Sequence, residues 1–189
     1  MSSSTPIRYS KSDYIETDTG NKVAKSCHIK GPSNIVLGGK TIIQPGVMIR
    51  GDLRRAGGSG PAVVIAVGKY CVMGENSVIR PPCKTYKGVF SYYPMKIGDY
   101  VSIGSNSIVE AASIGNGVEI GKNCIIGPLT IIKDNARIAD NSIVGPGTII
   151  PSLGEWGGSP ARPTVTLPES TPELIEAKAK AYYARFQPE

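Results

Sequence analysis

Residues 97–150 read IGDYVSIGSNSIVEAASIGNGVEIGKNCIIGPLTIIKDNARIADNSIVGPGTII, and this stretch decides the fold. An aliphatic residue recurs every six positions, with a single spacing of five after Val109. The aliphatic positions are Ile97, Ile103, Val109, Ile114, Ile120, Ile126, Ile132, Ile138, Val144 and Ile150. A small or β-branched residue usually stands four positions after each of them, as Val101 stands after Ile97. A period of six matches neither an α-helix nor the alternation of an isolated β-strand.

The repeat predicts an all-β fold of short parallel strands joined by tight turns. Three hexapeptides would close one triangular coil, with aliphatic side chains inside and Gly or Asn at turn positions of positive φ. Stacked coils would then bury one continuous core. The pattern resembles the left-handed parallel β-helix of hexapeptide repeats found in many acyltransferases and in gamma-class carbonic anhydrases. That resemblance implies a left-handed coil, against the usual right-handed crossover.

The spacing also predicts the organisation of the chain. The repeat occurs upstream at Leu37, Ile43 and Ile49, and again at Val67, Met73 and Ile79, with twelve extra residues after Ile49 and after Ile79. Both insertions follow the third hexapeptide of a coil, so segments 55–66 and 85–96 are expected to be loops on one corner of the prism. We expect an N-terminal extension over 1–22, the β-helix over 23–152, a linker over 153–170 and an α-helix over 171–187.

The C-terminal helix is predicted from its first residues. Thr171 is expected to be the N-cap, with Pro172 in the first turn and Glu173 near the positive end of the helix dipole. The preceding segment 153–170 is rich in Pro, Gly and Ser, which favours a linker along the prism surface. The N-terminal extension is expected to lie along the first coil or to cap it.

Composition limits the class of protein. The 189 residues include 40% hydrophobic and 19% charged residues, which fits one well-buried domain. No apolar run is long enough to span a bilayer and residues 1–18 are polar, so a cytoplasmic protein without membrane insertion is expected. The net charge of +6 comes from dispersed basic residues, which does not favour nucleic-acid binding. The cysteines lack a C-x-x-C pair and are expected to be free thiols: Cys27, Cys71, Cys83 and Cys124.

The histidine content limits the chemistry. Enzymes of this fold usually need histidine, as the base of an acyltransferase or as zinc ligands of a carbonic anhydrase. This chain has one histidine, His28, which is expected to be structural or exposed. Residues 49–52 and 67–80 resemble carbonic anhydrase motifs, yet Arg80 stands where that resemblance places the first zinc ligand. The other two ligands would fall within residues 102–115, which contain no histidine. No catalytic residue, metal site or cofactor is therefore expected.

Register predicts a column of charged side chains. Arg50, Arg80 and Glu110 each follow the third aliphatic residue of successive coils, so they are expected to stack one coil apart. Arg80 is then expected to pair with Glu110, and Arg50 with Asp52 or with a partner. A structural ladder is the first interpretation of this column, and a residual anion site is the second.

Aromatic residues concentrate in the second insertion. Four of them fall within eight positions: Tyr86, Phe90, Tyr92 and Tyr93. They are expected either to pack over the prism corner or to form a surface that binds a protein partner, since Tyr and Phe are frequent at interface hot spots.

Five segments resemble the dynactin subunit 5 family: residues 11–23, 34–54, 78–101, 114–127 and 170–186. The resemblance implies a non-catalytic subunit of the dynactin pointed-end complex, which supports dynein cargo adaptors, including those on endosomes, and microtubule-based transport. It implies as partners dynactin subunit 6, the pointed-end actin-related protein, a larger zinc-binding dynactin subunit and the adaptors, and it implies association with the cytoskeleton. The alternative is a hexapeptide-repeat acyltransferase or a degenerate gamma-class carbonic anhydrase.

Overall fold

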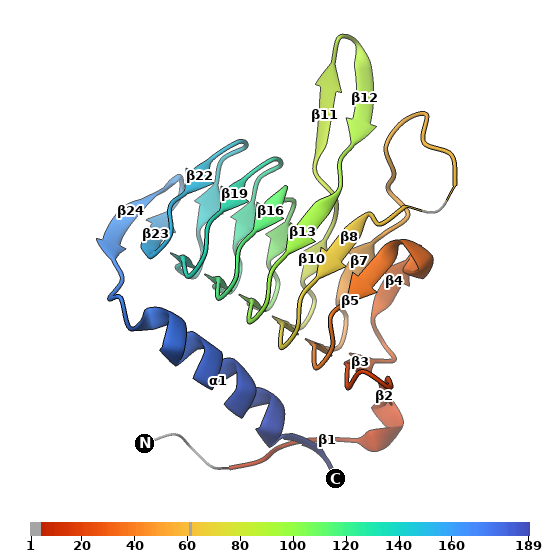
Figure 1. The fold of residues 1–189 in the computed structure, drawn as a ribbon, viewed down its shortest axis with the longest axis vertical. Helices are drawn as coiled ribbons and strands as arrows, with labels where there is room; N and C mark the ends of the chain where they lie inside the picture. Colours follow the sequence, from red (N-terminus) through yellow and green to blue (C-terminus); the bar gives the residue numbers. More distant parts are fainter. Residues whose placement is uncertain (1–4, 61) are drawn as a thin grey trace.

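The computed structural model describes residues 5–60 and 62–189. Residues 1–4 of the predicted N-terminal extension and Pro61 of the first insertion lie outside the described residues. The chain forms a left-handed parallel β-helix with one α-helix beside it (Figure 1). The fold expected from the six-residue repeat is therefore confirmed. No helix of the described ranges is long and apolar enough to cross a membrane.

Three sheets form the walls of the prism. The first wall contains β4 (His28–Lys30), β7 (Met48–Arg50), β10 (Val78–Ile79), β15 (Ile108–Val109), β18 (Ile125–Ile126) and β21 (Ile143–Val144). The second wall contains β5 (Ile35–Leu37), β8 (Ile65–Val67), β13 (Met95–Ile97), β16 (Ser113–Ile114), β19 (Ile131–Ile132) and β22 (Ile149–Ile150). The third wall contains β2 (Tyr14–Glu16), β3 (Lys22–Ala24), β6 (Ile42–Ile43), β9 (Val72–Met73), β14 (Ser102–Ile103), β17 (Glu119–Ile120), β20 (Arg137–Ile138), β23 (Gly154–Gly158) and β24 (Ala161–Thr166).

The repeated aliphatic side chains stack inside the prism. In the first wall Ile49 lies opposite Ile79, and Ile79 lies opposite Val109, all with 0% exposure. Small residues four positions after an aliphatic are buried as well: Val118, Cys124, Thr130 and Ala136. Each buried aliphatic side chain contributes roughly 1.5–3 kcal/mol. The core is therefore one continuous column held together by parallel ladders.

The corners depend on residues that tolerate a positive φ. Five asparagines have φ values between 55° and 60°: Asn76, Asn106, Asn123, Asn135 and Asn141. Carboxylate and amide oxygens at one corner also connect successive coils. Asp99 Oδ1 accepts from the Lys69 N–H at 2.9 Å, and Asn116 Oδ1 accepts from the Asp99 N–H at 2.9 Å. The turn residues thus bond one coil to the next as well as reversing the chain.

The second insertion is a β-hairpin rather than an irregular loop. β11 (Cys83–Tyr86) pairs antiparallel with β12 (Val89–Tyr92), and β13 then begins at Met95, inside the segment expected to be a loop. Lys87 and Gly88 form the turn with φ values of 47° and 78°. Two successive positive φ values match the twist of a two-residue hairpin, which explains why these strands pair. The first insertion remains without strands until β8 begins at Ile65, one residue before its expected end.

The segment expected to be a linker is also ordered as strands. β23 and β24 form an antiparallel pair at the end of the third wall. Trp156 lies opposite Ile138 in β20 and packs against the prism core. Because the last coil would otherwise expose core side chains and an unpaired strand edge, this hairpin extends and covers that end. Most of segment 153–170 is therefore β-structure, and the linker prediction was wrong for residues 154–166.

The α-helix of the described residues, α1 (Thr171–Arg185), lies along the outer face of the third wall (Figure 1). Its N-cap is Ser170, so Thr171 is the first helical residue and not the cap. The helix ends before the expected residue 187 because β25 (Phe186–Pro188) pairs in parallel with β1 (Ile7–Tyr9). The Phe186 ring stacks on Tyr9 with 4.6 Å between centroids. This pairing joins the two ends of the described chain.

Two short 3₁₀ segments complete the N-terminal part of the fold. One, η1 (Lys11–Asp13), precedes β2, and the other, η2 (Pro32–Asn34), precedes β5. β2 pairs antiparallel with β3 and therefore covers the start of the third wall. The part of the N-terminal extension that contains β2 thus lies against the first coil.

Candidate partner-binding surface

The β11–β12 hairpin projects from the corner between the first and second walls (Figure 1). Its tip carries large apolar side chains in solvent: Tyr86 is 57% exposed and Phe90 is 52% exposed. Val89, paired with Tyr86 across the hairpin, is also exposed. A two-stranded hairpin by itself is marginally stable in water, and exposed clusters of this kind are typical of binding surfaces.

The four aromatic residues predicted as candidates divide into two groups. Tyr86 and Phe90 lie at the exposed end, whereas Tyr92 and Tyr93 are half-buried at the base. The Phe90 ring meets the Tyr92 ring edge-on with 5.1 Å between centroids. The Tyr93 N–H donates to the Pro82 carbonyl at 2.8 Å, which ties the base of the hairpin together. Tyr86 and Phe90 are therefore the side chains best placed to meet a partner.

The first insertion contacts the base of the hairpin. It leaves the prism between β7 and β8, at the same corner from which the hairpin leaves between β10 and β13. The Ala56 N–H donates to Ser91 Oγ at 3.0 Å. Leu53, Val64 and Tyr93 line a small cavity of about 80 Å³ between the two segments. The two insertions thus contact each other at their bases and diverge beyond them (Figure 1).

The charged column is present, with one ion pair between coils. Arg80 Nη2 lies 2.8 Å from Glu110 Oε1, whereas Arg50 pairs with Asp52 two residues away, also at 2.8 Å. The hydrogen bond from Arg50 holds the pKa of the Asp52 carboxyl below its usual value. The hydrogen bond to Glu110 raises the pKa of the Arg80 guanidinium. The positive charges of Arg50 and Arg80 are therefore balanced by carboxylates of this chain.

The remaining residues considered for chemistry lie apart from one another. His28 is exposed on β4 in the first coil. Cys71 and Cys124 are buried thiols inside the prism, and Cys27 and Cys83 are half-buried; all four are free. Burial raises the pKa of the Cys71 thiol to about 12, which disfavours the nucleophilic thiolate.

Sequence reasoning missed exposed aliphatic side chains on the outer faces of two walls in the last two coils. They are Ile125 and Ile143 on the first wall and Ile131 and Ile149 on the second. Ile125 lies opposite Ile143, and Ile131 lies opposite Ile149. The signal was available in the doublets Ile125-Ile126, Ile131-Ile132 and Ile149-Ile150, because adjacent residues of a strand point to opposite faces.

A groove between α1 and the third wall was missed as well. It encloses about 280 Å³, and its lining includes Tyr100, Ile103, Ile175 and Tyr182. The helix is tied across it by Lys178, whose Nζ lies 2.9 Å from Glu119 Oε1. The packing of a helix against a wall follows from tertiary contacts, so no sequence spacing predicted this groove.

Two sequence relatives bear on identity. The family described as dynactin subunit 5 matches residues 4–189. Dynactin subunit 5 of Dictyostelium discoideum is 46% identical over 111 residues, covering 59% of this chain and 52% of that protein. Mitochondrial gamma carbonic anhydrase 2 of Arabidopsis thaliana is 25% identical over 174 residues, covering 92% of this chain and 57% of that protein. The chain thus spans about half the length of the curated relatives it matches.

Solved structures share the fold. A hexapeptide transferase family protein from Anaplasma phagocytophilum has a TM-score of 0.60 at 22% identity, covering 87% of this chain and 89% of that one. A mutant of the N-acyltransferase AntD from Bacillus cereus has a TM-score of 0.63 at 17% identity, covering 85% of this chain and 89% of that one. At such identities the likeness shows the fold alone.

Proposed function

We propose that this chain, which belongs to the dynactin subunit 5 family, is a non-catalytic structural subunit of the dynactin pointed-end complex. The observation that carries this proposal is the family match over residues 4–189, which includes the two corner insertions and α1 as well as the repeats. In this role the chain supports the binding of dynein cargo adaptors, including those on endosomes, and thereby microtubule-based transport. It acts in the cytoplasm, in association with the cytoskeleton.

The proposed neighbours are other dynactin subunits. They are dynactin subunit 6, the pointed-end actin-related protein and the larger zinc-binding subunit, with cargo adaptors as further partners. A rigid prism with bonded coils suits a scaffold, because its outward side chains keep fixed spacings along each wall. Tyr86 and Phe90 are proposed to contribute to one of these protein contacts, since exposed aromatic side chains at a projecting tip are well suited to anchor an interface.

The chemistry of the side chains supports the non-catalytic part of the proposal. A zinc hydratase needs three neutral imidazoles and an open coordination position for water. This chain has a single histidine, His28, on an outer strand, and Arg80 is engaged with Glu110. An acyltransferase of this fold usually needs a histidine as its base, and this chain has no histidine in the coils after β4.

The test is affinity isolation of the tagged full chain from native extract of its own cells, followed by mass spectrometry. We expect dynactin subunit 6, the actin-related protein and the larger zinc-binding subunit to co-purify in near-equal amounts. Sedimentation of the same preparation should place the chain in a large assembly. Recovery of the folded chain as a homotrimer free of dynactin subunits would support the enzymatic alternative instead.

A further inference from the structure

The exposed tip of the hairpin is positively charged as well as aromatic. Lys84 Nζ lies 5.8 Å from the centroid of the Tyr86 ring, and Lys87 Nζ lies 5.4 Å from it. Both lysine side chains are exposed. Attraction to the ring therefore keeps two ammonium groups close to an exposed aromatic side chain.

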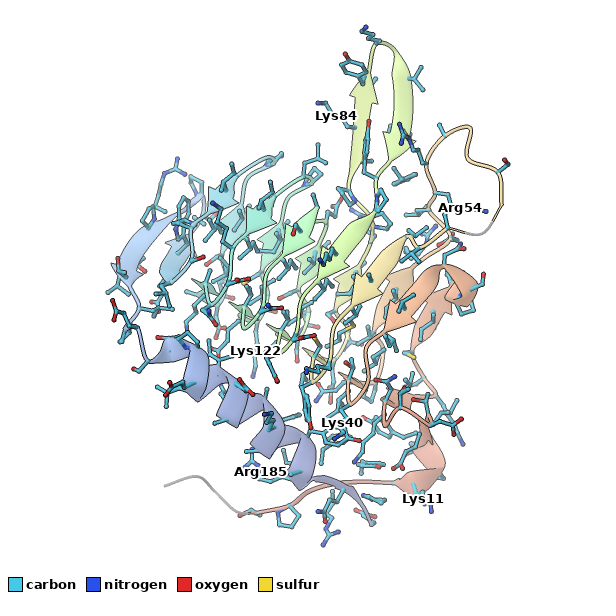
Figure 2. The ribbon with its side chains drawn as sticks, viewed as in Figure 1. Lys11, Lys40, Arg54, Lys84, Lys122 and Arg185 are labelled. Atoms are coloured by element: carbon cyan, nitrogen blue, oxygen red, sulfur yellow. The ribbon has the colours of Figure 1, made fainter. Side chains whose placement is uncertain are left out.

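The first insertion adds two arginines at the same corner of the prism. Arg54 and Arg55 precede Ala56, whose N–H is bonded to Ser91 of β12. Arg55 is exposed, and Arg54 is half-buried where it lines the cavity between the segments. Figure 2 shows Lys84 on the hairpin and Arg54 on the neighbouring loop. We name Arg54, Arg55, Lys84 and Lys87 the basic corner.

The basic corner is not neutralised by the chain itself. Within residues 5–60 and 62–189, none of its four side chains forms an ion pair. Glu75 is the only acidic residue between Leu53 and Ile97, and it lies in the turn between β9 and β10, at a different corner. Arg50 and Arg80, at the base of the two insertions, differ from the residues of the basic corner because each forms an ion pair with a carboxylate of this chain.

We infer that the basic corner binds an acidic segment of a partner protein, with apolar side chains of that segment against Tyr86 and Val89, which pair across the hairpin and share one face of it. Charge complementarity selects the acidic residues, because four cations without internal partners attract carboxylates over a Debye length of about 8–10 Å. The exposed aliphatic residues Val63 and Val89 favour a protein as the binding partner over a nucleic acid, because a phosphate backbone offers no apolar groups to contact them. The inference rests on the proposed function, because it takes the partner to be a protein that dynactin contains or recruits.

The direct test is zero-length cross-linking with a carbodiimide, applied to the native assembly isolated through the full chain. This reagent joins a lysine amine to a carboxylate only where the two are in contact. We expect Lys84 or Lys87 to be linked to an Asp or Glu of another polypeptide. If lysines elsewhere on the chain form such links in an intact dynactin assembly while Lys84 and Lys87 form none, the inference is overturned and the proposed function stands. Links from these lysines to another protein, in a preparation that contains neither dynactin subunits nor cargo adaptors, would retain the acidic partner but remove the proposed function.

Variants supply a second readout. The Lys84→Gln/Lys87→Gln chain should associate with its cross-linked partner about fivefold to tenfold more weakly at low salt. The difference should shrink as ionic strength rises from about 0.05 M to about 0.3 M. The matched control, Lys25→Gln/Lys133→Gln, removes two exposed lysines far from the corner and should bind normally. If the purified chain binds phosphatidylserine vesicles or poly-dT through Lys84 and Lys87 while partner association is unchanged, an acidic protein segment is excluded.

Discussion

Arg80 Nη2 and Glu110 Oε1 lie 2.8 Å apart on adjacent coils, although thirty residues separate them in the sequence. The register that brings them together pairs Ile79 with Val109, the inward residues that immediately precede them. The guanidinium occupies the position where the carbonic anhydrase resemblance places a zinc-binding imidazole. A cation held by a carboxylate there would repel a metal ion instead of binding it.

The first prediction concerns metal content and carbon dioxide hydration. The purified full chain, incubated with equimolar zinc and then dialysed, should retain far less than one zinc ion per molecule, because a lone exposed imidazole binds zinc weakly. It should hydrate carbon dioxide no faster than buffer. Elemental analysis and a stopped-flow pH-indicator assay measure the two quantities. Retention of one zinc ion per chain would contradict the non-catalytic proposal, and a His28→Gln chain is the control for adventitious binding.

The second prediction compares two neighbouring isoleucines in β18. Ile126→Ala should lower the free energy of unfolding by about 2–5 kcal/mol, because this side chain is 0% exposed in the column of aliphatic residues. Ile125→Ala should cost less than about 1 kcal/mol, because Ile125 is 43% exposed on the outer face. Urea denaturation followed by circular dichroism measures both. Equal losses would mean that the inward and outward assignment is wrong.

The third prediction concerns stability at alkaline pH. Burial raises the pKa of the Cys71 thiol from its ordinary value near 9 to about 12. Between those values the unfolded thiol loses a proton that the folded thiol keeps, so stability falls as pH rises above about 9. Cys71→Ala should reduce the slope of unfolding free energy between about pH 9 and pH 10 without abolishing it, because burial also raises the pKa of tyrosines such as Tyr14 and Tyr182. Burial raises the pKa of the Cys124 thiol as well, which adds to the slope that remains.

Urea melts at several pH values measure that slope for the parent and the variant. Cys71→Ala is expected to be less stable at neutral pH because it removes buried volume, so the slope and not the absolute stability is the readout. Identical slopes for the two chains would show that Cys71 ionises as readily in the folded state as in the unfolded state.

The fourth prediction concerns the aromatic tip of the hairpin. Replacing Tyr86 and Phe90 together by Ala should weaken association with the partner by roughly 2 kcal/mol or more if both are anchors. The stability of the isolated chain should change little, because both rings are more than half exposed. Tyr93, an equal candidate from the sequence, is a poor choice for this test because it is half-buried beside the first insertion.

Quantitative co-purification of the dynactin subunits and cargo adaptors with each chain measures the loss, and thermal unfolding of each chain checks that the fold is intact. Thr85→Ala is the matched control, since it lies on the same hairpin without an aromatic ring. Assembly of the double variant with unchanged affinity would mean that the two rings do not act as anchors.

The C-terminal strands mark a limit of sequence reasoning. Segment 153–170 has a loop-like composition, yet β23 and β24 form because the last coil leaves an edge and a core surface to cover. Similarly, Lys87-Gly88 is a weaker turn signal than the usual Asn-Gly, so the strands of the second insertion were not predicted. In both cases pairing between strands decided the local structure, while local composition suggested a loop.

The sequence by itself determined the prism, because a period of six admits only one set of inward side chains once three strands close a coil. It also determined the stacking of Arg80 on Glu110, since register follows from counting residues between aliphatic positions. Only the tertiary structure decided that Tyr86 and Phe90 are more than half exposed while Tyr92 and Tyr93 are half-buried, and that the loop carrying Arg54 contacts the hairpin carrying Lys84. Exposure and charge clustering depend on contacts between insertions from different coils, and no repeat in the sequence encodes those contacts.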